Sequence, residues 1–177
     1  NGTFKDCVFE GSNALRWCYA GETVVFENCV FSGSTYGVHF DSGANDILFK
    51  NCTFSGFNAF GAAVTMITFD GCTFVANGKS GYNGANLWGS AKMIDTEFIF
   101  DGNATYEWVD CRSADKTYEF TGCTINNGNF LNETYVSAAG IIKVDGTDYD
   151  LNNSTFISTA EELIAFANEV NVNNNAF

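Results

Sequence analysis

A six-residue pattern of apolar and polar positions recurs along most of the chain. It reads apolar, polar, Asp/Asn/Gly, small, polar, apolar, as in the segment FENCVF at 26–31. The seven copies begin at Phe4, Phe26, Phe49, Phe69, Met93, Phe120 and Val144. Successive copies lie about 22, 23, 20, 24, 27 and 24 residues apart, and a period of this size is typical of stacked-coil proteins.

Each copy predicts two short strands joined by a sharp corner. Apolar residues alternate before the corner, as at Val24 and Phe26, and again after it, as at Cys29 and Phe31. This period of two is the mark of a half-buried strand. The third position is always Asp, Asn or Gly, the residue types that best tolerate positive φ. The repeat therefore predicts a parallel β-helix in which equivalent residues stack as ladders.

At this level the chain resembles the pectin-lyase-like right-handed β-helix family, in its bacterial surface-protein branch. The resemblance covers roughly residues 1–150 and rests on the six-residue pattern. It implies an all-β fold, a single-stranded right-handed parallel β-helix of about seven coils. It says little about activity, because the same scaffold carries lyases, hydrolases, adhesins and spacers.

Five of the seven cysteines share one register of the repeat, namely Cys7, Cys29, Cys52, Cys72 and Cys123. A metal or redox site is one interpretation, but zinc sites usually show close Cys-x₂-Cys pairs and the chain has none. The alternative is a ladder of small buried thiols, since free cysteine behaves as a small hydrophobic residue. We expect Cys29, Cys52 and Cys72 to be buried and reduced, and we expect no metal and no cofactor.

The charge balance excludes some partners. The chain has a net charge of −13 with only eight Lys and Arg, which argues against nucleic acid and anionic membrane surfaces. No apolar run approaches the length of a membrane span. An extracellular or cell-surface location fits this acidic, solvated surface. Because the chain opens in mid-pattern at Asn1, we expect it to be part of a larger multi-module protein.

The last 20 residues differ from the repeat. Thr159 with Glu162 forms a predicted capping box, and Leu163, Phe166, Ala167 and Val170 follow as an apolar stripe. We therefore divide the chain into a β-helix domain, 1–157, and a short C-terminal α-helical segment, 158–177. This segment either caps the last coil or starts a following module.

The chain offers little for catalysis. The enzymes of this fold family use clustered carboxylates, with an Arg or Lys as base or with paired Asp groups. Here the only arginines are Arg16 and Arg112, the only histidine is His39, and the Asp residues of the repeat sit at corners. The sequence favours a non-catalytic module, adhesin-like or a stalk. The alternative is a polysaccharide-active enzyme, a lyase or glycoside hydrolase, or a fragment of one.

The variable stretches between the repeats hold a candidate carbohydrate-binding surface. Tryptophan offers a large apolar body with a polar handle, which suits stacking on sugars. The candidate ligand-binding residues are Arg16, Trp17, His39, Trp88, Glu107, Trp108 and Asp110. The competing interpretation is that the three tryptophans pack in the core or at its ends. The expected partner is a polysaccharide or a host or cell-surface glycan.

Overall fold

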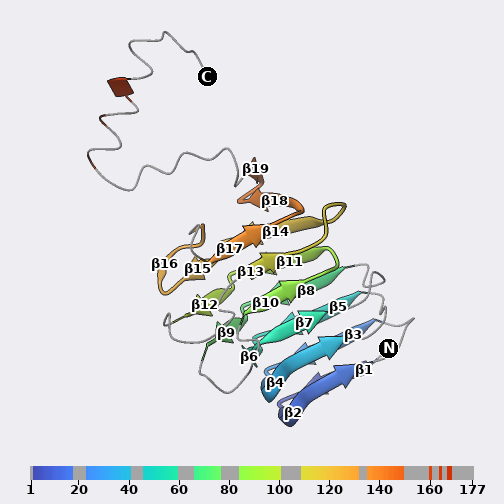
Figure 1. Ribbon diagram of the computed structural model, residues 1–177. Coiled ribbons are helices and arrows are strands. Elements are labelled where there is room, and N and C mark those ends of the chain that lie inside the picture. The colour runs from blue at the N-terminus through green and yellow to red at the C-terminus, as the bar shows by residue number, and fades with distance from the viewer. Residues whose placement is uncertain are drawn as a thin grey trace.

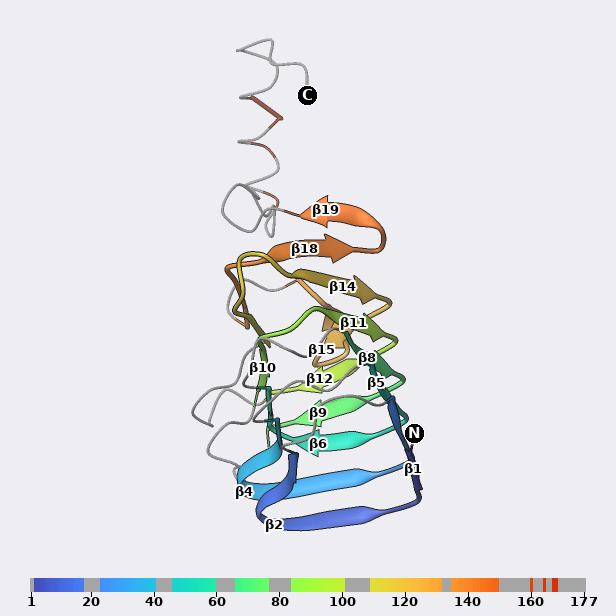
Figure 2. The same ribbon diagram turned by 90° about the vertical axis from the view of Figure 1, so that its right-hand side faces the viewer.

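The structure is a computed structural model, and it describes residues 2–17, 23–40, 46–59, 66–76, 84–100, 109–131 and 135–149, with Ala160, Ile164, Ala167 and Asn168. Within these residues the chain winds into a parallel β-solenoid of about five turns. Its strands are stacked along one axis, with β1 and β2 at one end and β18 and β19 at the other (Figures 1 and 2). The prediction of an all-β parallel β-helix is confirmed.

The strands of the solenoid form three rows. The first row consists of β1 (Gly2–Lys5), β3 (Val24–Glu27), β5 (Ile47–Lys50), β8 (Ile67–Asp70), β11 (Ala91–Ile94), β14 (Thr117–Thr121) and β18 (Ile141–Val144). The second row consists of the first halves of β2 (Val8–Trp17) and β4 (Val30–Phe40), followed by β6 (Thr53–Ser55), β9 (Thr73–Val75), β12 (Glu97–Ile99) and β15 (Thr124–Ile125). The third row consists of the second halves of β2 and β4, followed by β7 (Phe57–Ala59), β10 (Ala85–Leu87), β13 (Val109–Cys111) and β17 (Val136–Ala138).

The corner between the first and second rows has the backbone that the repeat predicts. Its third position has positive φ in the first six copies: Asp6, Asn28, Asn51, Gly71, Asp95 and Gly122. The side chains form a ladder of their own, since Nδ2 of Asn28 donates to Oδ1 of Asp6 at 2.9 Å. The repeated Asp/Asn/Gly position is therefore a conformational requirement of the corner.

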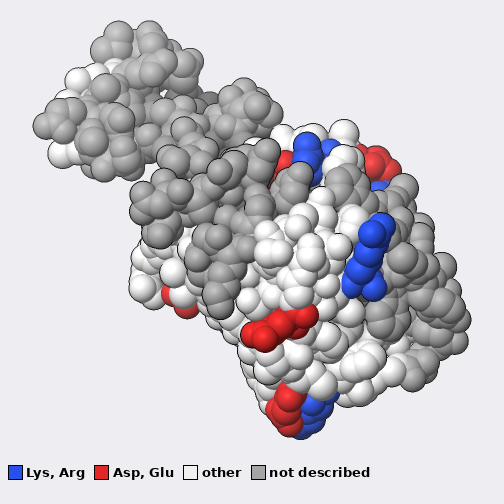
Figure 3. All heavy atoms as spheres, turned by 60° about the horizontal axis from the view of Figure 1, so that its bottom comes forward, with Lys and Arg blue, Asp and Glu red and all other residues white. Residues whose placement is uncertain are grey.

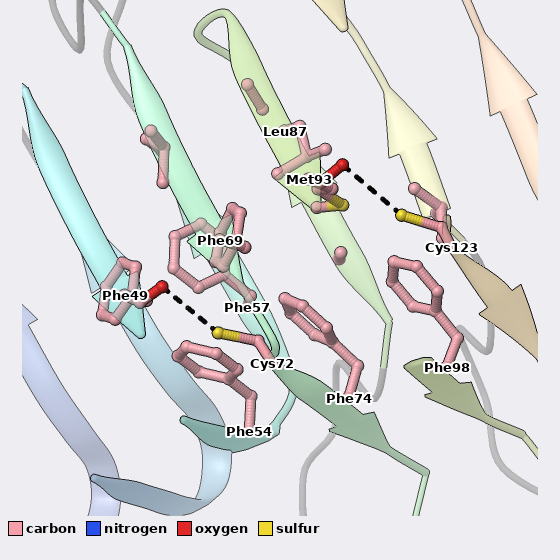
Figure 4. Close-up of a cluster of buried hydrophobic side chains, with 14 of the residues drawn as sticks. Phe49, Phe54, Phe57, Phe69, Cys72, Phe74, Leu87, Met93, Phe98 and Cys123 are labelled. Carbon is pink, nitrogen blue, oxygen red and sulfur yellow. Dashed lines mark hydrogen bonds between the residues drawn. The ribbon is translucent and has the colours of Figure 1, made fainter. Parts of the chain in front are cut away.

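Two aromatic ladders fill the core (Figure 4). In the first row, Phe4, Phe26, Phe49 and Phe69 stack with centroid distances of 5.1, 5.0 and 5.3 Å. In the second row, Phe9, Phe31, Phe54, Phe74 and Phe98 stack at 4.9, 5.1, 4.8 and 5.1 Å. Phe120 was expected to join the first stack, but Met93 lies between it and Phe69 in the register. Phe120 stacks on Phe130 instead, at 4.2 Å.

The cysteines of the repeat form a ladder of buried thiols beside these rings. Cys29, Cys52 and Cys72 are each 1% exposed, and all six cysteines in the described part of the chain are unbridged. The thiols of Cys29, Cys52, Cys72 and Cys123 each donate to a backbone carbonyl of the preceding coil, as from Cys72 to Phe49 at 3.4 Å and from Cys123 to Met93 at 3.5 Å (Figure 4). The prediction of buried, reduced thiols is confirmed, and burial raises the pKa of Cys123 to about 11.

The solenoid has fewer turns than the seven coils predicted, and two antiparallel hairpins lie at its C-terminal end. Asp145 and Gly146 have φ of +47° and +81° and join β18 to β19 (Thr147–Tyr149) as an antiparallel hairpin. Asn126 and Asn127, at +51° and +60°, join β15 to β16 (Gly128–Asn129) in the same way. A type I′ turn requires two successive residues with positive φ and reverses the chain into a hairpin. A single residue with positive φ makes only the corner found in the other coils.

The predicted C-terminal helix is described only in part. Ala160, Ile164, Ala167 and Asn168 have helical backbone and are exposed. Ala167 was placed in the apolar stripe, so this member of the stripe is not covered. Leu163, Phe166 and Val170 lie outside the described residues, and so does the boundary between 1–157 and 158–177.

Candidate functional site

The outward face of the third row carries polar side chains at one repeated position. In β4, Val38 and Phe40 are buried in the core and His39 lies between them. In β10, Asn86 lies between the core residues Ala85 and Leu87. Because successive side chains of a strand point to opposite faces, the intervening residue points away from the core.

This outward position aligns from coil to coil. The backbone register places the six residues opposite one another in the order Arg16, His39, Asn58, Asn86, Asp110 and Ser137. We call this set the polar row. Neighbouring members are about 4.8 Å apart along the solenoid axis, the spacing of paired strands. Arg16, His39, Asn86, Asp110 and Ser137 thus place polar side chains along the outward face of the third row.

The polar row is covered in its middle and open at both ends. His39 is only 8% exposed and Asn86 only 4%, whereas Arg16 and Ser137 are exposed. The His39 ring stacks on Tyr36 with a centroid distance of 4.6 Å. His39, one of the predicted ligand-binding residues, is therefore largely covered and packed against a neighbouring ring.

Beside the far end of the row, four side chains from three coils meet. The guanidinium carbon of Arg112 lies 4.8 Å from the centroid of the Trp88 ring. The same side chain pairs with Asp110, from Nε to Oδ2 at 3.2 Å. Ser137 donates from Oγ to the other carboxylate oxygen of Asp110 at 2.9 Å. We call Trp88, Asp110, Arg112 and Ser137 the Trp88 cluster.

Backbone hydrogen bonds hold this cluster in place. The amide of Arg112 donates to the carbonyl of Leu87 at 3.0 Å, and Oγ of Ser113 donates to the carbonyl of Trp88 at 2.6 Å. Below them, the Tyr118 hydroxyl donates to the Leu87 carbonyl at 2.9 Å and accepts from the Ser113 amide at 3.1 Å. Tyr118 is fully buried, and burial raises the pKa of its hydroxyl. The hydroxyl is therefore a neutral structural support at ordinary pH.

The Trp88 cluster has the chemistry of a binding surface. The Arg112 side chain is 42% exposed, so its guanidinium offers donors to solvent. Asp110 neutralises it locally, and its carboxylate is already held by Arg112 and Ser137. The cluster therefore combines a partly exposed indole, a planar donor group and a hydroxyl, without a free charge.

Two pockets in the described part of the structure lie elsewhere, toward the C-terminal end of the solenoid. A pocket of about 440 Å³ is lined by Phe120, Phe130, Val144, Tyr149 and other residues, and Asp145 is its one carboxylate. A smaller pocket of about 270 Å³ contains Glu119 between Lys92 and Lys143. Among the described lining residues each pocket holds a single carboxyl group, whereas glycoside hydrolysis uses a pair. Among the described residues, no group of three or more His, Cys, Asp or Glu is placed to hold a metal ion.

The predicted site residues fall into three groups. Arg16, His39 and Asp110 share the polar row, and Trp88 lies under the guanidinium of Arg112, which pairs with Asp110. Trp17 ends β2, but its side chain is outside the described set. Glu107 and Trp108 are outside it as well.

The prediction missed Arg112 and Ser137 as members of the site. For Arg112 a signal was available, because it lies two residues after Asp110 and alternation along the strand places both on one face. Ser137 is revealed only by the register that pairs it with Asp110.

No family model, no curated protein and no solved structure matches this chain. In the described part of the chain, no helix is long and apolar enough to cross a membrane. The assignment of the fold therefore rests on the parallel ladders themselves, and the function must be argued from the side chains on their surface.

Proposed function

We propose that this chain is a non-catalytic module of pectin-lyase-like type, from a bacterial cell-surface or secreted protein, that binds carbohydrate through the Trp88 cluster. The observation that carries the proposal is the geometry of that cluster. An aromatic ring, a guanidinium over it and a carboxylate that accepts a hydrogen bond from a hydroxyl lie together beside β10 and β13. Sugars present an apolar face to an aromatic ring and hydroxyls to planar polar groups, so these side chains match both.

The ligand class that fits best is an uncharged glycan. Asp110 neutralises Arg112, so the cluster lacks the free positive charge that a uronic-acid polymer would require. The net charge of −13 also opposes the approach of a polyanion. The acidic surface with few basic groups supports an extracellular location, where neutral glycans are accessible.

A glycan array with three forms of the protein tests the proposal. Wild type is compared with Trp88→Ala and with a matched control, Tyr149→Ala, which removes a partly buried aromatic side chain from the C-terminal hairpin. We expect Trp88→Ala to weaken binding at least about tenfold, equivalent to about 1.4 kcal/mol, and Tyr149→Ala to bind as wild type does. Circular dichroism checks that both variants are folded.

Two outcomes would contradict this function. Equal glycan binding by wild type and Trp88→Ala would place the sugar on another surface. Release of unsaturated or reducing sugars from a polysaccharide incubated with the wild-type protein would favour the enzyme alternative over the non-catalytic module.

A further inference from the structure

The outward side of the first row carries a column of alternating charge. In β1, β3, β5 and β8 the residue that follows the stacked phenylalanine points away from the core, because successive side chains of a strand alternate between faces. The backbone register sets these residues opposite one another from coil to coil. In order they are Lys5, Glu27, Lys50 and Asp70, which we call the charged column.

An uncharged column runs beside it. The residue that precedes the stacked phenylalanine in each strand also points outward, and these residues are Thr3, Val25, Leu48 and Thr68. Val25 and Leu48 are partly buried and form the apolar centre of the column, with one threonine beyond each of them. We call the two columns together the first-row face.

The first-row face is neutral in a strongly acidic protein. Its two lysines and two acidic residues sum to zero, whereas the chain has a net charge of −13. Two such faces therefore do not repel each other as two average surfaces of this protein would. In the view of Figure 3, charged groups of both signs lie among mostly uncharged atoms.

The charged column is accessible to a second molecule. Nζ of Lys5 lies 3.3 Å from Oε1 of Glu27, and these side chains are 56% and 32% exposed. An exposed ion pair of this kind contributes little to the stability of a single molecule. Lys50 is exposed as well. The side chains of the column can therefore reach across an interface without weakening the fold.

The order of charges along the column is complementary to its own reverse. A two-fold axis parallel to the strands, midway between β3 and β5, sets β3 of one copy against β5 of the other and β1 against β8. Glu27 then faces Lys50 of the other copy, and Lys5 faces Asp70 of the other copy. Each contact occurs twice, because a two-fold interface that brings residue i to j also brings j to i.

The same axis matches the uncharged column. Val25 faces Leu48 of the other copy at the centre, so apolar side chains meet apolar side chains. Sliding one copy by one coil would instead set Lys5 against Lys50 and Glu27 against its own counterpart. Juxtaposed like charges disfavour that arrangement, so the alternation selects a single register.

We propose that two copies of this chain associate side by side through their first-row faces, in antiparallel orientation about this two-fold axis. Packed sheets lie about 10 Å apart, a gap that lysine and glutamate side chains from both copies can bridge. The contact is lateral, and neither end of the solenoid takes part in it. Each copy contributes two columns of four side chains, fewer than the about 20–30 residues per side of a standard interface. The dimer is therefore weak and dissociates on dilution.

Sedimentation velocity over an about hundredfold range of protein concentration tests this, because mass action shifts a dimer with dilution. Wild type should pass from monomer to dimer. Glu27→Lys sets two lysines against each other, and Lys50→Glu sets two glutamates against each other, each at two places in the dimer. Either variant alone should associate at least about tenfold more weakly. An equimolar mixture restores opposite charges at both places and should recover the wild-type dimer.

A matched control separates this contact from a general effect of charge. Lys143→Glu changes the net charge as Lys50→Glu does, by two units from −13 to −15. Lys143 lies in β18, outside the first-row face, and pairs with Asp148 at 3.4 Å. This variant should dimerise as wild type does, and circular dichroism checks that every variant is folded.

Three results would overturn the proposal. The first is a wild-type protein that is monomeric at every concentration. The second is a mixture of Glu27→Lys and Lys50→Glu that associates no better than its components, since a charged column that acts only within one molecule gains nothing from mixing. The third is a dimer that Lys143→Glu weakens as much as Lys50→Glu does.

Discussion

Replacing Gly71 by valine probes the corner on which every coil depends. Gly71 has φ of +62°, and the left-handed region costs an L-residue about 1–2 kcal/mol, the upper part for a β-branched one. A Cβ added there would lie 2.7 Å from Oδ1 of Asn51. The Asn51 side chain must then move and give up its 3.5 Å bond to Asn28, which adds about 0.5 kcal/mol for an exposed hydrogen bond. We expect a total loss of about 2 kcal/mol.

Two other glycines separate strain from collision. Gly146 has φ of +81° with no heavy atom within 4 Å of an added Cβ. Gly146→Val should therefore lower the free energy of unfolding only by the backbone strain, about 1–2 kcal/mol. Gly2 has neither a positive φ nor a neighbour within 4 Å. Gly2→Val should therefore change the free energy of unfolding by less than about 0.5 kcal/mol.

Urea unfolding followed by circular dichroism measures all three variants against wild type. The stability of a solenoid is a sum over neighbouring coils, so a central corner such as Gly71 should affect the whole transition. We expect the urea midpoint to be highest for Gly2→Val, lower for Gly146→Val and lowest for Gly71→Val. An unchanged midpoint for Gly71→Val would refute the view that the corner requires a left-handed residue.

Two further predictions concern the thiols. Cys29, Cys52 and Cys72 should react with a thiol reagent only after denaturation, because they are 1% exposed; fast labelling of the native protein would contradict the buried ladder. Stability should also decline as pH rises from about 9 to about 11, because the unfolded chain loses the Cys123 proton before the folded one does. A pKa difference of about 2 corresponds to at most about 3 kcal/mol. Cys123→Ala should flatten this decline, and an identical decline in that variant would exclude Cys123 as its cause.

The strands and corners of the fold could be predicted from sequence because each coil is specified by a short local pattern. The alternation around Cys29 and the Asn or Gly at the corner are properties of six residues, and stacking follows from their repetition. The end of the solenoid was harder. Asp145–Gly146 is a strong hairpin signal, yet it occupies the place of a corner in the seventh copy and was interpreted as one.

The site was predictable only in part, because it depends on register across stretches of unequal length. The polar row pairs His39 with Asn58 and Asn86 with Asp110, and no local pattern reveals those pairings. Trp88 and Asp110 were selected for their chemistry, and the Arg112 guanidinium lies over the Trp88 ring and pairs with Asp110. Arg112 joins them through alternation along β13, and Ser137 through a strand one coil away.

The residues that make this fold easy to infer are also the ones least able to reveal its function. The phenylalanines of the repeat are packed against each other, and the thiols donate hydrogen bonds to backbone carbonyls. The Asn and Gly residues form the corners. Each of these residues is engaged in contacts within the fold and is therefore unavailable to a ligand. What remains for function is the outward position of the third row and the side chains next to it, where the sequence repeats least. A solenoid can thus change its ligand without changing its ladders, which is why the glycan test must be made on Trp88 and not on the repeat.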